Sequence, residues 1–490
     1  MTRGAGLRCR LIGVAILAST LLSASIAADQ RPYGVPPAYE GALDSLAAIN
    51  IRNVELQTLH DDLAEPWAFE FLSPDELLVT ETRGRLLRVP LAADRPVIEI
   101  SGLPIIATSQ QQTGLLDVAL HPQFEQNHRI YFSYAEADPD TGRYYRTQVA
   151  TARLVGAALE DLRPLLADAP FGWSPSNFGG ALEFDGQGRL LITIGDRSEE
   201  VLAQRGDRLE GKILRLTDDG AVPAENPFIG DPDIDDRILA LGVRNAQGLV
   251  RDPETDAVYF AEHGPLGGDE VNRLMPGANY GWPTISYGLA YSTAAVAEGT
   301  HAPGMVQPLF YYLPSEAISP LAIYRGAMFP EWHGDLLVGA LKGRHVSRLD
   351  LDGEVVRSEY PILGEIAARI RDLKIGPDGA LHVLTEDGRL LRLVRTEADA
   401  PATRSPDGER VYGLVCAGCH DTGAAEAPRL SDACAWRAIA TKGWDEVWRN
   451  TLSGINAMPE RGLCHVCTDA HLEAAARYLL AQGERCTDEL

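Results

Sequence analysis

The sequence predicts an all-β six-bladed β-propeller followed by a small all-α domain. Three observations support this fold class. A unit of two hydrophobic strands, joined by a turn rich in Pro, Asp and Gly, recurs six times between residues 55 and 395. A segment with linker composition follows, and after it the apolar residues recur at helical spacing. Repeated antiparallel hairpins at intervals of tens of residues are typical of propeller blades.

The first 27 residues have the pattern of a secretory signal peptide. Three arginines precede an apolar run over residues 11–22, and Ser25-Ile26-Ala27 suits cleavage after Ala27. We therefore expect a periplasmic protein whose mature chain begins with an extension over residues 28–54. The apolar run is too short to span a bilayer, and no later stretch approaches the roughly 18 uninterrupted apolar residues that a span requires. The sequence thus predicts no transmembrane segment.

Residues 55–394 are assigned to the propeller, with one hairpin in each blade. A large β-sandwich is the alternative, because the near-absence of helical periodicity before residue 395 suits both architectures. Residues 284–318, rich in Ala, Tyr and Pro, are expected to form a long loop between blades, where specificity is set. The six predicted hairpins pair residues 67–72 with 76–80, 115–120 with 129–132, 181–184 with 190–193, 248–250 with 258–260, 321–324 with 335–338, and 372–375 with 380–384.

A linker and a helical domain complete the chain. Residues 395–406 are small and polar and include two prolines, which is the composition of a linker. Residues 407–490 form the predicted helical domain, and residues 471–480 within it place apolar side chains on one face of a helix. Those side chains are Leu472, Ala475, Ala476, Leu479 and Leu480.

The chain is strongly acidic. It has 44 Lys and Arg residues against 69 Asp and Glu residues, which gives a formal net charge of -25. Removing residues 1–27 takes away three arginines and no acid, which leaves 41 basic residues and a net charge of -28. Such a charge argues against nucleic acid as a partner. It favours solubility and suits a basic redox partner.

The most specific motif is C-x-x-C-H, formed by Cys416, Cys419 and His420. This motif attaches haem covalently through its two cysteines. Met458 stands where a loop can bring its thioether sulfur to the iron opposite His420, and His/Met ligation leaves no axial position for substrate. Two C-x-x-C pairs in one domain also suit a four-cysteine zinc site, but His420, Met458 and the expected export favour haem c and electron transfer.

The mature chain keeps four further cysteines once Cys9 leaves with the signal peptide. All four lie in the predicted helical domain, and the predicted propeller has none. In an exported protein they suggest two disulfides. The preferred pairing, among three that are possible, is Cys464 with Cys467 and Cys434 with Cys486.

Short segments spread over residues 55–395 carry a resemblance to a known family. They are Gln112–Pro122, Phe178–Gly180, Ile194–Asp196, Gly211–Leu216, Val243–Leu249, Glu262–Pro265 and Asn279–Pro283. In this order and number they resemble the soluble glucose/sorbosone dehydrogenase family, six-bladed propellers that use pyrroloquinoline quinone (PQQ). The tail similarly looks like a short class I cytochrome c with an extra C-x-x-C, here Cys464 and Cys467, after its methionine ligand.

The resemblance implies a set of cofactor contacts, and physical chemistry gives each a reason. PQQ is a flat tricarboxylate, and planar guanidinium groups bind carboxylates through paired, charge-assisted hydrogen bonds. Oxygen ligands suit Ca²⁺, which can polarise the quinone carbonyl as a Lewis acid. The implied PQQ contacts are Arg244, Arg369, Arg371 and Lys342, with Gln112, Asn245 and His263, and the implied calcium ligands are the carbonyls of Gly264 and Pro265.

Some of these residue types also have structural explanations. An isolated arginine in a propeller is more often an ion-paired surface residue, but four basic residues in three blades match the family here. His263 taken alone would favour a structural histidine. We interpret His121 and Asp117 as structural, and Trp67, Trp282 and Trp332 as core residues.

One position departs from the family pattern. Family members that oxidise sugars have a histidine general base immediately before the segment that here begins at Phe178, and this chain has Asn177. An amide cannot accept a proton at neutral pH, which costs a factor of about 10² to 10⁴ in rate. Asp196 matches the carboxylate that would orient the histidine. It is expected to act as the base, directly or through a water, or to hold a turn.

Two functions of different classes follow. The first is an exported quinohaem oxidoreductase, which oxidises a sugar, an alcohol or an aldehyde with PQQ and passes electrons through the haem to an external redox protein or quinone. The fusion favours it, because a tether raises the local concentration of the electron acceptor. The second is a non-catalytic propeller that binds a ligand and carries an electron-transfer cytochrome c domain. The substitution at Asn177 favours this alternative.

Overall fold

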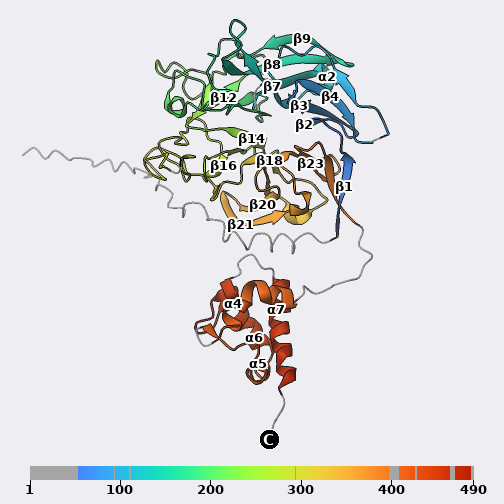
Figure 1. Cartoon of the computed structure of the whole chain (residues 1–490), viewed down its shortest axis with the longest axis vertical. Coiled ribbons are helices and arrows are strands. Elements are labelled where there is room, and N and C mark those ends of the chain that lie inside the picture. The colour runs from blue at the N-terminus through green and yellow to red at the C-terminus, as the bar shows by residue number, and fades with distance from the viewer. Residues whose placement is uncertain are drawn as a thin grey trace, which may run out of the picture.

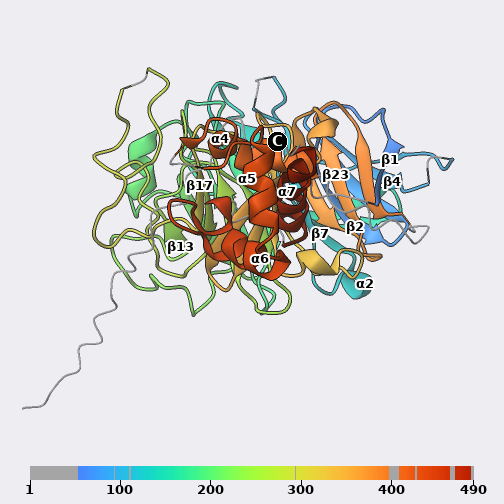
Figure 2. The ribbon, with the colours of Figure 1, turned by 90° about the horizontal axis from the view of Figure 1, so that it is seen from below.

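The computed structural model describes residues 53–92, 94–109, 112–292, 294–396, 408–424, 427–463 and 469–486. Its first part is a ring of six four-stranded antiparallel sheets, and its second part is a small helical domain (Figure 1). The six-bladed propeller and the all-α tail predicted from the sequence are therefore confirmed. Figures 1 and 2 show the helical domain as a body of its own outside the ring of blades.

Each blade has four strands, which lie in chain order from the propeller axis outward in the first five blades, whereas the outermost strand of the sixth is β1. The blades comprise, first, β2 (Pro66–Ser73), β3 (Glu76–Glu81), β4 (Arg85–Pro90) and β5 (Ile98–Ile100); second, β6 (Leu115–Leu120), β7 (Arg129–Ala137), β8 (Tyr145–Val155) and β9 (Ala158–Pro164); third, β10 (Gly179–Phe184), β11 (Leu190–Ile194), β12 (Lys212–Leu216) and β13 (Ile238–Leu241); fourth, β14 (Ala246–Arg251), β15 (Val258–Glu262), β16 (Asp269–Arg273) and β17 (Phe310–Tyr312); fifth, β18 (Ile318–Ile323), β19 (Leu336–Ala340), β20 (Val346–Asp352) and β21 (Val355–Ile362); and sixth, β22 (Ile370–Ile375), β23 (Leu381–Thr385), β24 (Leu390–Arg395) and β1 (Val54–His60).

The six predicted hairpins correspond to the two innermost strands of the six blades. Every residue is buried in the second strands β11 and β19, whereas the innermost strands β14 and β22 include charged residues and are only partly buried. Strands buried on both faces have continuous hydrophobic runs, which is the pattern that the sequence presents. The innermost strands β2, β6, β10, β14, β18 and β22 contact one another in turn around the axis.

The N-terminal strand closes the ring. β1 pairs antiparallel with β24 as the outermost strand of the sixth blade, from Val54 opposite Arg395 to His60 opposite Leu390. We call the end of the axis at which the innermost strands begin the start end of the propeller. Because neighbouring strands are antiparallel, β24 begins at the start end and finishes at the opposite end.

Hydrogen bonds between neighbouring blades hold the ring together. Hydroxyl groups of second strands donate to carbonyl groups of the next blade, and carboxylates of innermost strands accept from its amides. The hydroxyl bonds run from Thr80 to Leu116 O (2.5 Å), Ser133 to Gly180 O (2.6 Å) and Thr193 to Ala246 O (2.8 Å), and the carboxylate bonds from Leu182 N to Asp117 (2.8 Å) and from Phe69 N to Asp372 (2.9 Å).

The structural interpretations of two polar residues are confirmed. Asp117 joins the second and third blades, and it also accepts from the amide of Val118 at 2.7 Å. His121 accepts from the amide of Gln123 at 2.9 Å and lies 3.3 Å from Asp218. Both side chains therefore serve the fold, away from the residues proposed for chemistry.

The predicted long loop over residues 284–318 is wrong in one respect. The segment contains β17, the outermost strand of the fourth blade, which pairs with β16. A strand of three residues is too short to show a periodic pattern in the sequence, although its residues Phe-Tyr-Tyr have high strand propensity. The rest of the segment runs to the start end, where Leu289 pairs with Leu266.

Few helices interrupt the propeller, and they form most of the second domain. The propeller has α2 (Phe124–Asn127) and three short 3₁₀ segments, η1 (Glu200–Gln204), η2 (Pro330–Trp332) and η3 (Gly364–Ile366). The second domain has α3 (Gly408–Val411), η4 (Tyr412–Cys416), α4 (Ala417–His420), α5 (Ala433–Ala440), α6 (Trp444–Ser453), η6 (Glu460–Leu463), α7 (Asp469–Ala481) and η7 (Gln482–Arg485). Among the described residues, no helix is long and apolar enough to cross a membrane.

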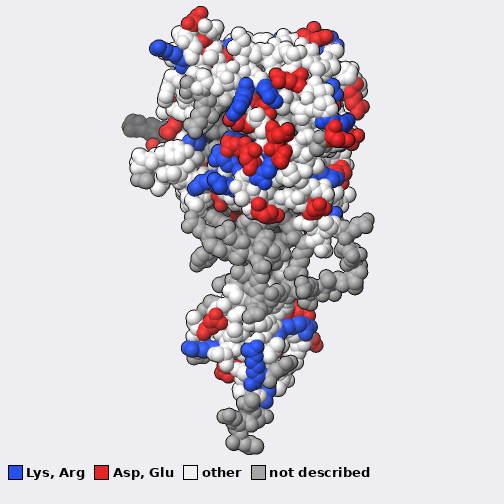
Figure 3. Space-filling model, turned by 45° about the vertical axis from the view of Figure 1, so that its right-hand side comes forward, with Lys and Arg blue, Asp and Glu red and all other residues white. Residues whose placement is uncertain are grey.

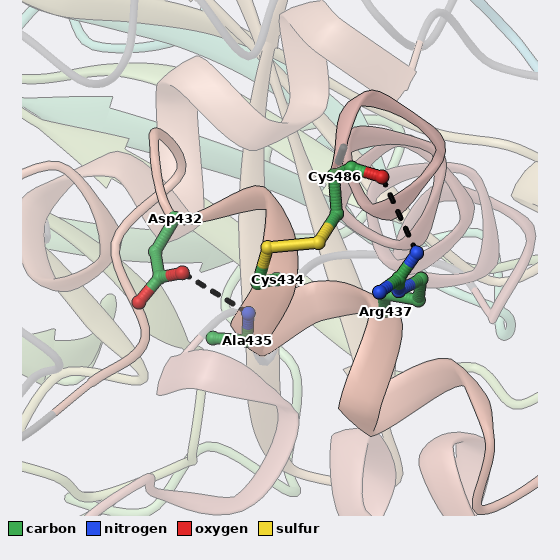
Figure 4. Close-up of a disulfide and its surroundings, with 5 residues drawn as sticks. All are labelled: Asp432, Cys434, Ala435, Arg437 and Cys486. Atoms are coloured by element: carbon green, nitrogen blue, oxygen red, sulfur yellow. Dashed lines mark hydrogen bonds between the residues drawn. A yellow bond between two sulfur atoms is a disulfide. The ribbon is translucent and has the colours of Figure 1, made fainter. Parts of the chain in front are cut away.

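A disulfide joins α5 to the segment that follows η7. Cys434, in the first turn of α5, is bonded to Cys486, which follows η7, so this predicted pair is confirmed (Figure 4). Asp432 caps α5 by accepting from the amide of Ala435 at 3.0 Å, and Arg437 donates to the carbonyl of Cys486 at 3.3 Å. The predicted pair Cys464–Cys467 lies outside the described residues.

The predicted amphipathic helix is α7. Leu472, Ala475, Ala476 and Leu479 are buried, as expected for its apolar face. Figure 3 shows acidic and basic side chains interspersed on one face of the propeller. On that face the negative net charge of the chain is therefore not gathered into one acidic patch.

Candidate active site and haem attachment site

The predicted cofactor residues of the propeller all lie at its start end. Some immediately precede an innermost strand, as Asn177 precedes β10 and Arg244 precedes β14, and others immediately follow a second strand, as His263 follows β15. A second strand runs antiparallel to the innermost one and so returns to the start end. The fold therefore brings together residues that are widely separated in the sequence.

Asn177 and Asp196 form a fixed pair. The side-chain amide of Asn177 donates from Nδ2 to Oδ1 of Asp196 at 2.9 Å, which leaves the amide oxygen Oδ1 as an acceptor. The indole of Trp282 donates to Oδ2 of Asp196 at 2.8 Å, and the amide of Ser198 donates to Oδ1 at 2.8 Å. Asp196 is 1% exposed, so these three donors hold a buried carboxylate. Its orientation is set by its neighbours.

The local backbone at Asn177 depends on close approach. Asn177 has a positive φ of 52°, a region that asparagine tolerates better than most residues. A Cβ at Gly195 would lie 2.1 Å from the carbonyl oxygen of Asn177, so only glycine fits there. Gln112 accepts from the amide of Asn177 at 2.9 Å, and Asn245 accepts from the amide of Gly179 at 3.0 Å. Both predicted polar residues thus adjoin the Asn177 loop.

Arg244 is directed at the loop that follows β15. Its Nη1 donates to the carbonyl of His263 at 2.8 Å and to that of Gly264 at 3.1 Å, and its own amide donates to Glu262 at 2.6 Å. The guanidinium also lies 5.3 Å from the ring of Trp282. Arg244 therefore links the Asp196 cluster to the predicted calcium loop.

Arg369 and Arg371 share one acidic partner. Arg369 lies at 2.5 Å from Glu386, and Arg371 is also paired with Glu386. Arg371 is largely buried, and its guanidinium stacks 4.6 Å from the ring of Trp67. Two positive charges against one carboxylate leave a net positive charge at this part of the start end. Such a place suits an anionic ligand.

The surroundings of His263 indicate that Arg244, Arg369 and Arg371 lie near one another. Burial lowers the pKa of His263 to about 3, and the positive charges of Arg244, Arg371 and Arg369, in that order, lower it further. Its Nε2 atom is buried and has no hydrogen-bond partner among the described residues. A neutral imidazole with an unused nitrogen, near three guanidinium groups, fits a ligand that carries both carboxylates and ring heteroatoms. These residues therefore suit PQQ.

The remaining predicted contacts are Lys342 and the calcium ligands Gly264 and Pro265. Lys342, in the turn after β19, is exposed, and its Nζ donates to the carbonyl of Ser315 at 2.9 Å. Gly264 lies in a tight loop, because a Cβ there would approach Gly267 O to 2.2 Å. No group of three or more His, Cys, Asp or Glu side chains suited to a metal ion occurs in the described part of the chain. Any calcium at Gly264 and Pro265 would depend on backbone carbonyls, and that of Gly264 also accepts from Arg244.

The C-x-x-C-H motif lies at the junction of η4 and α4. Cys416 and Cys419 are free thiols, and burial raises the pKa of Cys416 to about 11. The Nδ1 atom of His420 is 2.8 Å from the carbonyl oxygen of Pro428, and the imidazole packs 5.3 Å from Trp436. A hydrogen bond from Nδ1 to a carbonyl fixes the ring and leaves Nε2 for an iron ligand. The residues therefore fit a c-type haem.

Comparisons with known proteins identify the propeller. A family model described as Glucose / Sorbosone dehydrogenase matches residues 63–392. The chain belongs to this family. The aldose sugar dehydrogenase YliI of Escherichia coli (strain K12) is 39% identical over 346 residues, which cover 69% of this chain and 92% of that protein. A crystal structure of glucose dehydrogenase has a TM-score of 0.66 at 40% identity and covers 69% of this chain and 99% of that structure.

The helical domain is similar to cytochromes c. A model described as Cytochrome C oxidase, cbb3-type, subunit III matches residues 404–479. Cytochrome c5 of Azotobacter vinelandii is 44% identical over 70 residues, which cover 14% of this chain and 84% of that protein. The chain is thus a propeller of the glucose/sorbosone dehydrogenase family joined to a cytochrome c domain, as the motifs predicted.

The structure adds residues to the site that sequence reasoning missed. Trp282, interpreted as core, is buried but also holds Asp196, and its segment was among those that resemble the glucose/sorbosone dehydrogenase family. Trp67, also interpreted as core, is half-buried and stacks on Arg371, whereas Trp332 is a true core residue. Glu386 was not singled out, because an acid in a Glu-Asp-Gly turn is unremarkable in sequence.

Met458 lies in a tight turn after α6. Its amide donates to the carbonyl of Ile455 at 2.9 Å, and its carbonyl accepts from the amide of Ile455 at 3.0 Å. The following segment, η6, contacts η4, which ends at Cys416. The turn is therefore close in the fold to the segment that carries the first haem cysteine, as an iron ligand requires.

Replacing Met458 by alanine is expected to change the absorption spectrum of the oxidised haem and to lower its reduction potential, because a methionine ligand raises the potential. A redox titration of the purified full-length protein measures both. Met275→Ala, in the propeller, is the matched control and should leave the haem unchanged. An unaltered spectrum in Met458→Ala would show that another group binds the iron.

Proposed function

We propose that this protein is an exported, periplasmic quinohaem dehydrogenase. It oxidises a hydroxyl or aldehyde group of a sugar or alcohol at the start end of the propeller, and electrons leave through the haem to an external redox protein or quinone. The observation that carries this proposal is the convergence of Arg244, Arg369 and Arg371 around His263, next to Asn177 and Asp196. The relatives named glucose and aldose sugar dehydrogenases support sugars as the substrate class.

The residues at the start end would hold the cofactor by charge and shape. Arg244, Arg369 and Arg371 suit the three carboxylates of PQQ, and Lys342 can supply a further positive charge. Gln112 and Asn245 fix the neighbouring loop, and the carbonyls of Gly264 and Pro265 suit Ca²⁺. When bound, PQQ would supply a hydride acceptor for the substrate carbon, and Ca²⁺ would supply a Lewis acid.

The hydroxyl proton needs an acceptor within this chain. The amide oxygen of Asn177 can accept a hydrogen bond from the substrate hydroxyl and orient it, but it cannot take the proton. Three donors occupy Asp196, and a carboxylate has roughly four lone-pair positions, so one remains free. We assign the proton to Asp196, reached through a water that Asn177 positions.

A substrate panel tests the proposal. The full-length protein carrying haem is loaded with PQQ and Ca²⁺ and mixed with sugars and alcohols while haem reduction is followed by absorbance. We expect at least one sugar to reduce the haem, and omission of PQQ to abolish the reaction. If PQQ binds but no compound reduces the haem, the dehydrogenase proposal fails.

That negative result would support the second candidate, a propeller that binds a ligand without oxidising it. The observation in its favour is Asn177, whose amide is bound to Asp196 where a general base is expected. In this case PQQ or a sugar would bind to the oxidised protein, as measured by calorimetry, with no change at the haem.

Replacing Arg371 by alanine is expected to weaken PQQ binding by about 10- to 100-fold, because a hydrogen bond to a charged group contributes roughly 1.5–3 kcal/mol. Fluorescence titration of the full-length protein with PQQ and Ca²⁺ measures the affinity. Arg205→Ala is the matched control, since Arg205 is paired with exposed Asp207. Equal affinities of Arg371→Ala and the unmodified protein would place PQQ elsewhere.

A further inference from the structure

We propose that the cytochrome c domain docks on an apolar rim beside the candidate site, and that the linker reaches around the sixth blade to allow it. This inference rests on the proposed function, because it names the surface through which the haem collects electrons. It follows from where the chain leaves the propeller, from the length of the linker, and from the exposed side chains at the start end.

The chain leaves the propeller at the end opposite the candidate site. β22 begins at the start end, where Arg369 and Arg371 lie, and β23 returns there to Glu386. β24 then runs away from the start end and finishes at Arg395, and the amide of Thr396 donates to the carbonyl of Asn53 at 2.9 Å. The cytochrome c domain is thus tethered at the wrong end for direct contact with the site.

The linker is long enough to correct this. Residues 397–407 separate Thr396 from Gly408, the first described residue of the cytochrome c domain. A fully extended segment of this length spans about 40 Å. The six residues of β24 rise about 20 Å, so the linker exceeds the height of the blade about twofold. The linker therefore covers the height of the blade once it is extended to about half of its maximum span.

An apolar rim lies beside the candidate site. It consists of Leu266, Leu289, Tyr291 and Leu313, which are 41%, 47%, 72% and 46% exposed. Leu266 and Leu289 pair through two backbone hydrogen bonds, and a Cβ on Gly267 would touch Leu313 Cδ1 at 2.4 Å, so these three residues come from neighbouring segments, and Tyr291 lies two residues after Leu289. Leu266 directly follows Pro265. Exposed apolar groups in one patch mark an interaction surface.

The occupant of the rim is the cytochrome c domain of the same chain. Electron transfer falls steeply with distance, so a haem that serves the site must come close to the start end. The tether keeps this one domain at high effective concentration. No residue of the rim is charged. A contact through the rim therefore places no like charges together, although the propeller and the cytochrome c domain both contribute to the negative charge of the chain.

Photo-crosslinking tests the docking without PQQ or substrate. p-Benzoylphenylalanine is placed at Leu289 of the full-length haem-loaded protein, and crosslinked peptides are identified by mass spectrometry. We expect crosslinks within one chain, from Leu289 to residues 408–486, with a yield independent of protein concentration. No crosslinks to that domain, or crosslinks only between chains, would overturn the proposal.

Changes of linker length test the reach. Deleting residues 398–406 reduces the maximum span to about 10 Å, which is about half the height of the blade. We expect the Leu289 crosslink to disappear and the rate of sugar-dependent haem reduction to fall at least tenfold, while dithionite still reduces the haem. Replacing residues 397–407 by eleven Gly and Ser residues should preserve both. A deletion variant that crosslinks normally would contradict the proposal.

Variants of the rim separate docking from catalysis. Leu266→Asp with Leu289→Asp should lower the rate of haem reduction at least tenfold while a soluble dye is still reduced at the normal rate. Val355→Asp, at an exposed residue at the opposite end of the propeller, is the matched control and should change neither rate. If neither dye nor haem is reduced in the unmodified protein, the proposed function fails, and the crosslinking result alone decides the docking.

Discussion

Replacing Asn177 by histidine is expected to raise the rate of sugar-dependent haem reduction by a factor of about 10² to 10⁴. Asp196, which now accepts from Asn177 Nδ2, would accept from the imidazole Nδ1 and leave Nε2 free to take the hydroxyl proton. Trp282 and Ser198 hold Asp196 in the required orientation in either case. Stopped-flow absorbance of the haem in the full-length, PQQ-loaded protein measures the rate.

The pH dependence and two controls make this result specific. The rate of Asn177→His should rise with pH as the imidazole loses its proton, because only the neutral ring is a base. Asn177→Gln keeps an amide and should give no gain, and Asp196→Asn combined with Asn177→His should lose most of it. Equal rates of Asn177→His and the unmodified protein would show that proton transfer to residue 177 does not limit turnover.

Replacing Cys434 and Cys486 by serine is expected to lower the free energy of unfolding of the cytochrome c domain by about 4 kcal/mol. The disulfide closes a loop of 52 residues, and cross-linking a loop of this length removes that much entropy from the unfolded chain. Other contacts that stabilise this part of the domain include the Asp432 cap and the bond from Arg437 to Cys486 (Figure 4).

Denaturant unfolding of the full-length protein, followed at the haem, measures this loss. The unmodified protein with its disulfide reduced should match the double serine variant. The unfolding of the propeller, followed by its strand signal in circular dichroism, should be unchanged and serves as the internal control. A double variant as stable as the oxidised protein would mean that the unfolded domain is already constrained, for example by the covalent haem.

The two inner strands of each blade could be predicted from sequence, and the outermost strand could not. β11 and β19 are buried throughout and therefore appear as continuous apolar runs. β9 has five exposed residues in a row, so its sequence has no hydrophobic pattern that would predict its pairing with β8. β1 pairs with a strand more than 300 residues away, and no local pattern predicts such a partner.

The site divides in a similar way. The basic residues and Asn177 could be placed through the family resemblance, because their segments have distinctive order. Their partners could not, since Glu386 and Trp282 lie 15 and 86 residues from Arg371 and Asp196 in the sequence and meet them only in the folded propeller. The convergence of three arginines around His263 depends on the closed ring and so appears only in three dimensions.

The pairing of β1 with β24 sets an order for the maturation of this protein. The first strand of the propeller has no partner until the last one has been made, and Gln57 bonds to Arg392 across 335 residues. The ring therefore cannot close before β24 has been made, and the blades that precede β24 form an open ring until then. The haem cysteines Cys416 and Cys419 follow β24 closely in sequence. Closure of the ring and attachment of the haem thus become possible when nearly the same length of chain has been made.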